Sequence, residues 1–129
     1  MRTLMTLSFI FILLGCNKEE DNRDLNEVSL TFTRIQTPGA VSFPQNIVST
    51  VRVSGSDLCY RFTHFNIKHP KANVYEVYAK GAYPAKPTMC PQAIYNKDTT
   101  VQIQPAAPGQ YILRFYNQGL YKTDTVQVN

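Results

Sequence analysis

The chain offers few side chains that could perform chemistry. Its two histidines, His64 and His69, are five residues apart, and within one strand that odd spacing places them on opposite faces. We therefore do not expect them to bind one metal ion. The sequence contains no Gly-x-Ser-x-Gly motif, phosphate loop, calcium loop or Cys-x-x-Cys zinc spacing. After residue 27 the acidic residues are few and far apart: Asp57, Glu76, Asp98 and Asp124. The sequence favours a protein that is not an enzyme and binds no cofactor or metal.

The first of the three cysteines, Cys16, ends an apolar run. Residues 4–15 contain Thr6 and Ser8 as their only polar side chains, and Arg2 precedes them. A charged start and a short apolar body are typical of a secretory signal peptide. As a helix this run would be about 18 Å long, too short to cross a hydrocarbon core of about 30 Å. We expect residues 1–15 to be a signal peptide.

The stretch Leu13-Leu14-Gly15-Cys16 resembles the lipobox of bacterial lipoproteins. This resemblance implies that the Cys16 thiol receives a diacylglyceryl group, that the chain is cut before Cys16, and that the new amino terminus is often acylated as well, typically with palmitate. Each buried methylene contributes about 0.8 kcal/mol, so two or three acyl chains anchor a protein firmly. The resemblance thus implies a membrane partner reached through acyl chains, without a spanning helix.

The next segment, residues 16–27, is acidic and holds one large apolar side chain, Leu25. It cannot bury enough surface to order itself, so we predict a disordered tether. Lys18-Glu19-Glu20-Asp21 resembles the surface-export signal of lipoproteins from the Bacteroidota group, and residues 98–100 and 124–126 resemble the O-glycosylation sequon of that group. The resemblance implies an outer-membrane lipoprotein exposed at the cell surface, with retention on the periplasmic side as the alternative.

Cys59 and Cys90 remain once Cys16 carries lipid. In the oxidising compartment of an exported protein, such a pair is expected to form a disulfide. Closing a loop of about thirty residues would stabilise the fold by about 3–4 kcal/mol. The alternative is a thiol pair that binds copper together with Met89 or a histidine, although no second pair of ligands stands at a defined spacing.

The remainder of the chain is basic but has no basic cluster. Residues 28–129 contain ten Lys or Arg against four Asp or Glu, and the cations are scattered singly. Nucleic acid is therefore not a predicted partner. Solvated strand faces account for such scattered charge, and the alternative is an envelope partner such as an anionic glycan or lipopolysaccharide.

Alternating apolar and polar residues predict about seven strands and a single domain over residues 28–129. The predicted strands begin near residues 28, 47, 58, 75, 101, 111 and 120. We expect the third to end at His69-Pro70 and the fourth to break at Gly81. In residues 116–121, "YNQGLY", we expect a three-residue hairpin with Gly119 in the left-handed conformation.

The segment "PAAPGQY", residues 105–111, resembles the tyrosine corner of immunoglobulin-like sandwiches. This resemblance implies an all-β, immunoglobulin-like antiparallel sandwich in which the Tyr111 hydroxyl bonds to the backbone near residues 103–107. The chain departs from antibody domains because it has no tryptophan and has Leu113 where the second bridging cysteine would stand. Barrels and jelly rolls are the alternatives, although neither needs a proline-rich corner.

The connection over residues 81–99 is longer than a hairpin requires, and long connections are often functional. Tyr83, Lys86, Met89 and Tyr95 are its candidate binding residues, held by prolines and the Cys90 disulfide. The alternative is an irregular edge packed over the core by the same side chains. The leading hypothesis is a lipid-anchored, non-enzymatic binding or structural module of the cell envelope. The alternative is a small protease inhibitor or protective factor that acts through this loop.

Overall fold

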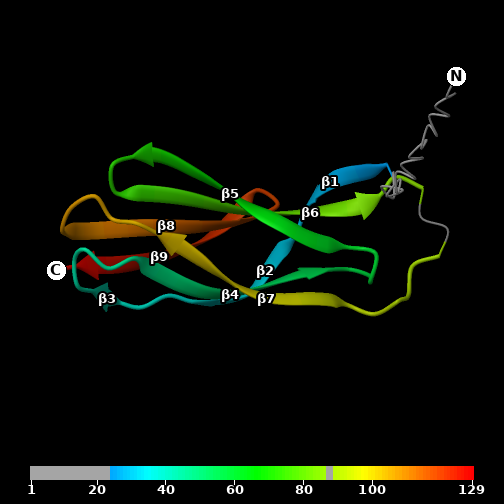
Figure 1. Ribbon diagram of the computed structural model, residues 1–129, viewed down its shortest axis with the longest axis horizontal. Helices are drawn as coiled ribbons and strands as arrows, with labels where there is room; N and C mark the ends of the chain where they lie inside the picture. The colour runs from blue at the N-terminus through cyan, green and yellow to red at the C-terminus, as the bar shows by residue number, and fades with distance from the viewer. Residues whose placement is uncertain (1–23, 87–88) are drawn as a thin grey trace, which may run out of the picture.

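The computed structural model describes residues 24–86 and 89–129. Within these ranges the chain forms nine strands in two facing sheets and no helix, so the predicted all-β sandwich is confirmed (Figure 1). Because it has no helix, this part of the chain has no helical segment that could span a membrane. Residues 1–23, with Cys16 and most of the predicted tether, lie outside the described residues. The strands are β1 (Leu25–Ser29), β2 (Thr31–Gln36), β3 (Ala40–Val41), β4 (Ile47–Gly55), β5 (Arg61–Lys71), β6 (Val74–Pro84), β7 (Tyr95–Ile103), β8 (Gly109–Asn117) and β9 (Leu120–Val128).

The larger sheet has six strands and is organised around β6. β5 pairs along nearly the whole length of one edge of β6. The opposite edge of β6 is shared by two strands: β8 pairs with Val74–Tyr78, and β1 pairs with Lys80–Pro84. β9 and the short β3 complete this sheet beyond β8. The β6–β8 and β3–β9 pairs are parallel, so the sheet is mixed rather than purely antiparallel as predicted. The smaller sheet has the order β2-β4-β7.

The core lies between the two sheets and consists of alternate residues on their facing sides. Val51 and Val53 of the smaller sheet are almost completely buried, and so are Leu113 and Phe115 of the larger sheet. Phe32 packs edge-on against Phe115 with ring centroids 5.3 Å apart. Truncating Leu113 or Phe115 to alanine would cost about 2–5 kcal/mol. Because these positions face inward, the residues that alternate with them along each strand lie on the outside.

The first predicted strand is in fact two strands in different sheets. β1 belongs to the larger sheet and β2 to the smaller one, and Leu30 is the residue between them. Leu30 is buried, and its N–H donates to the carbonyl of Ala79 at 3.0 Å. The alternation of apolar residues continues without interruption through this change of sheet, because the side chain of Leu30 points into the core shared by both sheets. The pattern therefore could not reveal the break.

Strands β5 and β6 are longer than predicted. β5 continues through Pro70 to Lys71, because it is an edge strand of its sheet and a proline there removes no ladder hydrogen bond on its open side. β6 continues through Gly81 to Pro84. A Cβ at Gly81 would lie 2.5 Å from the carbonyl oxygen of Arg61 and 3.1 Å from Leu30. Gly81 is thus required by the close approach of neighbouring chain, and it does not end the strand.

The last two strands pair directly, as predicted, but their loop has two residues rather than three. Asn117 is the partner of Leu120, and Gln118 and Gly119 between them have φ angles of 44° and 86°. Two successive residues with positive φ are the signature of a type I′ turn, whose twist matches that of the flanking strands. Gly119 adopts this conformation without cost, whereas Gln118 is the only non-glycine residue with positive φ among the described residues.

The chain enters β8 through the corner that carries Tyr111. The Tyr111 side chain is buried, and its hydroxyl donates to the carbonyl of Ala107 at 2.8 Å. The geometry is that of the tyrosine corner inferred from the "PGQY" segment. It fixes the connection between β7, in the smaller sheet, and β8, in the larger one.

Candidate functional site

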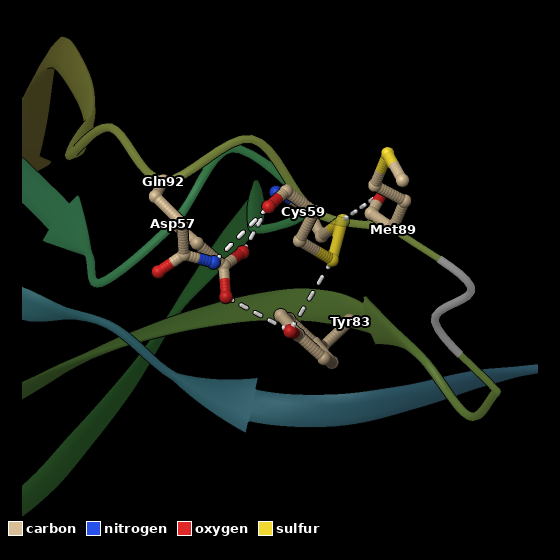
Figure 2. The surroundings of a disulfide bond; sticks show 6 residues. Asp57, Cys59, Tyr83, Met89 and Gln92 are labelled. Carbon is tan, nitrogen blue, oxygen red and sulfur yellow. Dashed lines mark hydrogen bonds between the residues drawn. A yellow bond between two sulfur atoms is a disulfide. The ribbon is translucent and has the colours of Figure 1, made fainter.

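A disulfide joins two connections at one end of the sandwich. Cys59, just before β5, and Cys90, between β6 and β7, have sulfur atoms 2.01 Å apart and Cα atoms 5.5 Å apart. Figure 2 shows the surroundings of this disulfide, with Asp57 and Tyr83 close to it. The predicted disulfide is present. Among the described residues the one group of potential metal ligands is Asp57 with these two cysteines. Because both sulfur atoms are bonded to each other, they are not available as the thiolates that a copper site would need.

Asp57 ties this disulfide to strand β6. One carboxylate oxygen accepts the N–H of Cys59 at 2.9 Å, and the other accepts the hydroxyl proton of Tyr83 at 2.9 Å (Figure 2). The hydrogen bond to Asp57, with a smaller contribution from burial, raises the pKa of Tyr83. The Tyr83 ring packs on Tyr60 at a centroid distance of 4.7 Å. Through these contacts Tyr83 stabilises the disulfide-linked end of the sandwich.

The four candidate loop residues fall into two pairs. Tyr83 lies in β6 and Tyr95 begins β7, so the connection comprises residues 85–94 rather than 81–99. The Tyr95 hydroxyl accepts the N–H of Phe62 at 3.0 Å and so holds β7 to β5. Lys86 is exposed and Met89 is 87% exposed. Of the predicted set, Lys86 and Met89 are exposed, whereas Tyr83 and Tyr95 are half-buried.

A groove of about 730 Å³ runs over the outer face of the smaller sheet. Its lining includes Thr33, Arg34, Arg52, Ser54, Tyr60 and Asn96, together with the exposed Ile94. Because Val51 and Val53 face the core, the intervening Arg52 and the following Ser54 lie on the outside. Binding sites for small ligands are usually hollows of about 300–1,000 Å³. The groove is large enough for such a ligand, and the sequence analysis did not identify it.

The floor of the groove is a chain of polar side chains across three strands. The Ser54 hydroxyl donates to the side-chain oxygen of Asn96 at 2.6 Å, and the Thr33 hydroxyl lies 3.1 Å from that of Ser54. Ser54 and Asn96 are direct partners in the β4–β7 ladder. Ser54 gives its proton to Asn96, and the Thr33 hydroxyl has two acceptors within reach, Ser54 and the Arg52 carbonyl at 3.4 Å. The Asn96 amide N–H groups and the second lone pairs of the hydroxyls remain to meet a ligand.

A row of charges lies beside this floor. Arg34 stands opposite Arg52 in the β2–β4 ladder, and Arg52 stands opposite Asp98 in the β4–β7 ladder. Arg52 donates two hydrogen bonds to the Asp98 carboxylate, at 2.7 and 2.9 Å. The Arg52 guanidinium lowers the pKa of Asp98, and Arg34 and Lys97 lower it further. Arg34 forms no ion pair with another described residue, so this row has one positive charge in excess.

A β-bulge places Arg34 in that row. The β2–β4 register shifts between Phe32 and Arg34, so Thr33 is an extra residue on β2. As a result Thr33 and Arg34 both lie on the outer face, whereas Phe32 and Ile35 face inward. Without the bulge, alternation would direct Arg34 toward the core. The side chain of Asn117 holds the neighbouring residue, accepting from the N–H of Phe32 at 2.8 Å and donating to its carbonyl at 3.1 Å.

Residues 49–128 match the family model described as the ORF11 beta-sandwich domain. The chain belongs to this family. No curated protein and no solved structure matches the chain. The part of this chain that matches the ORF11 beta-sandwich domain contains most of β4 and all of β5 to β9. It includes Arg52, Ser54 and Asn96 of the groove. Strand β2, which contributes Thr33 and Arg34 to the groove, lies before the matched region.

Proposed function

We propose that this protein is a lipid-anchored lipoprotein of the bacterial outer membrane whose sandwich is a non-enzymatic binding module at the cell surface. The anchor is proposed from the lipobox-like sequence that ends at Cys16 and from the acidic segment after it. The binding role is supported by one observation above all. The groove on the smaller sheet gathers two arginines, six hydroxyl side chains and two amides on a face that the core does not need.

The proposed anchor would keep the groove close to the envelope. Eight residues separate Cys16 from β1, and a chain of that length extends at most about 30 Å. The backbone N–H of Ala85 donates to the carbonyl of Asp24 at 2.9 Å, so the chain enters the sandwich beside the β6–β7 connection (Figure 1). The disulfide-linked end would therefore face the membrane. Components of the envelope itself are the partners within reach.

Replacing the lipidated cysteine tests the anchor. A Cys16→Ser variant should appear in the soluble fraction, while the unchanged protein should be extracted only with detergent. Mass spectrometry of the mature unchanged protein should show acyl mass on Cys16 and loss of residues 1–15. Mature protein without acyl mass would rule out the anchor.

Site-specific cross-linking tests the binding role. A photoreactive residue in place of Ile94 should cross-link envelope material in intact cells, because this exposed side chain lines the groove and takes no part in the hydrogen bonds of its floor. The matched control is the same photoreactive residue at Gln127, an exposed position on the outer face of the larger sheet. Equal cross-linking at both positions, or none at Ile94, would rule out the groove as a binding site.

Protease inhibition is a second candidate function, favoured by the exposure of Met89. This side chain is 87% exposed and immediately precedes the disulfide-bonded Cys90. A protruding side chain on a cross-linked connection could enter a protease specificity pocket at low entropic cost. Inhibition of secreted proteases that is lost in a Met89→Asp variant and retained in a Lys86→Asp variant would support this role. No inhibition by the unchanged protein would exclude it.

A further inference from the structure

We propose that the groove binds an acidic saccharide, a hydroxyl-rich chain bearing carboxylates, and that Arg34 receives one of the carboxylates. This inference rests on the proposed binding function and names the class of ligand. The evidence comes from the charge row, the polar floor and a second hollow that continues the groove.

The charge row contains an arrangement that is unfavourable without a ligand. Two like charges directly opposite each other on neighbouring strands destabilise a sheet, and Arg34 and Arg52 are such a pair. Asp98 neutralises only one of them, through the two hydrogen bonds from Arg52. A carboxylate placed on Arg34 would remove the remaining excess charge. The planar guanidinium offers that carboxylate two parallel hydrogen bonds.

The bulge at Thr33 indicates that the position of Arg34 is a built feature of the strand. Bulges redirect side chains and are common beside functional sites. Strand alternation alone would direct the Arg34 side chain inward. The bulge instead places it on the outer face, with Thr33, Ser54 and Asn96. Asn117 bonds both backbone groups of Phe32, directly before the bulge, and so holds the local conformation.

The floor suits the hydroxyl groups of a sugar. Hydroxyl and amide groups both donate and accept hydrogen bonds, as sugar hydroxyls do. An extended peptide is a poorer fit, because peptides that bind sheets usually add a strand to an edge and fill pockets with alternate side chains. This groove lies over the face of the smaller sheet, across β2, β4 and β7.

A second hollow of about 230 Å³ lies next to the groove and favours a ligand of several sugar units. Ser29 and Gln118 line both hollows. The second hollow forms because β1 ends at Ser29 and β8 ends at Asn117 along the same edge of β6. It adds the rings of Tyr78 and Tyr116, stacked at 4.6 Å, and Lys80.

Lys80 provides a second cation along this path. Its ammonium group donates to the Ser29 hydroxyl at 3.3 Å and is not paired with a described carboxylate. Lys80 lies on the outer face of the larger sheet, because the neighbouring Ala79 faces the core. A saccharide that reaches both Arg34 and Lys80 would therefore have to pass around the rim at Ser29 and Gln118, which line both hollows. The rings of Tyr78 and Tyr116 do not offer open faces to a sugar, because they stack on each other, Lys68 lies over Tyr78 and Tyr121 packs on Tyr116.

Titration calorimetry with the full chain, purified in detergent, tests the ligand class. The probes are tetragalacturonate, a neutral galactose tetramer of equal length, and tetraglutamate. We expect tetragalacturonate to bind at least ten times more tightly than either of the other two. Equal binding of the neutral tetramer, tighter binding of the acidic peptide, or no binding of tetragalacturonate would overturn the proposal.

A matched pair of variants tests the role of Arg34. Arg34→Gln and Arg61→Gln each remove one exposed positive charge, but Arg61 lies on edge strand β5 outside both hollows. We expect Arg34→Gln to weaken tetragalacturonate binding at least tenfold and Arg61→Gln to change it less than twofold. Equal losses would mean that the probe responds only to net charge, and the proposal would fall.

The cross-linking experiment separates this inference from the proposed function. If tetragalacturonate fails to bind while the photoreactive residue at position 94 still captures envelope material, the acidic saccharide is wrong and the binding module stands. If position 94 captures nothing, the binding module is wrong as well. Backbone amide spectra of the unchanged protein and of the position-94 variant verify that both are folded.

Discussion

The disulfide-linked end and the groove are two regions of the molecule that use their side chains differently. The disulfide-linked end contains the aromatic residues that the sequence marked as a binding loop, and the structure uses Tyr83 and Tyr95 there as hydrogen-bonded supports. The groove contains no conspicuous motif, yet its polar groups converge on open space. Aromatic residues near a cysteine are readily absorbed by packing, whereas polar residues on the outer face of a sheet remain free to bind.

Removing the disulfide should produce the largest effect and should separate the two regions. In the Cys59→Ser, Cys90→Ser double variant, the loop loses its cross-link, and the free energy of unfolding should fall by about 3–4 kcal/mol. Chemical denaturation of the double variant and the unchanged protein provides the measurement. The groove floor belongs to β2, β4 and β7, so tetragalacturonate affinity should persist wherever the variant remains folded. A loss of binding in the folded variant would mean that the two regions act as one site.

A methyl group at Gly55 should disturb both regions, because Tyr60 belongs to both. The ring of Tyr60 packs against Gly55 on one side and Tyr83 on the other, and it also lines the groove. A Cβ at Gly55 would overlap the inner atoms of the Tyr60 side chain, including its Cβ at 2.7 Å. We expect Gly55→Ala to cost about 1–3 kcal/mol of stability, as overpacking usually does.

Amide spectra of the Gly55→Ala variant would locate the disturbance. Shifts should extend from Tyr60 both to Asp57 and to Asn96. The matched control is Gly39→Ala, since nothing lies within 4 Å of a Cβ built there. Equal stability of the Gly55 variant and the unchanged protein would show that the Tyr60 ring is not fixed between the regions.

The difference between the regions also explains what the sequence could predict. The disulfide and the pairing of β8 with β9 depend on local or pairwise signals, namely two cysteines and a turn with Gly119. The groove depends on the register of β2. Simple alternation assigns Arg34 to the inner face, and only the extra residue Thr33 reverses this assignment.

The change of sheet at Leu30 was equally hidden from the sequence. Leu30 continues the apolar alternation, although its neighbours on either side pair with different sheets. Contacts between residues distant in sequence explain why the end of β6 was predicted wrongly. Gly81 suggested the end of a strand, yet a glycine is needed there because the Arg61 carbonyl and Leu30 come close to it. Such contacts form between residues distant in sequence, and no local pattern encodes them.

Removing single hydroxyl groups should reduce stability less. Two such changes compare the tyrosine corner with the disulfide-linked end. Tyr111→Phe removes the hydrogen bond to the Ala107 carbonyl, and Tyr83→Phe removes the one to Asp57. We expect each change to reduce the free energy of unfolding by about 1 kcal/mol, because Ala107 and Asp57 are not fully buried and water can replace the lost donor. Denaturation curves provide the measurement. A much larger loss of unfolding free energy for Tyr83→Phe would indicate that the disulfide-linked end contributes more stability than one hydrogen bond to Asp57 accounts for.

Replacing Asp98 should have the smallest effect on stability and a distinct effect on binding. The pKa of Asp98 is lowered by Arg52, so the pair stabilises the fold above the unfolded pKa of about 4, and this contribution is lost as the pH falls through the lower folded pKa. Asp98→Asn should flatten that part of the stability profile only slightly, because both side chains are exposed and solvent weakens the pair.

Binding should change in the opposite direction in the same variant. Without the Asp98 carboxylate, Arg34 and Arg52 would both be unneutralised in the ladder, and the groove should attract carboxylates more strongly. We expect Asp98→Asn to tighten tetragalacturonate binding several-fold at low salt, with a gain that declines as salt is added because screening weakens exposed charges. Asp124→Asn, a change of equal charge on β9 in the larger sheet, should leave the affinity unchanged. If Asp98→Asn instead weakens binding as much as Arg34→Gln does, the ligand depends on Asp98 holding Arg52 in place. The excess charge at Arg34 would then not be what distinguishes the groove from the disulfide-linked end.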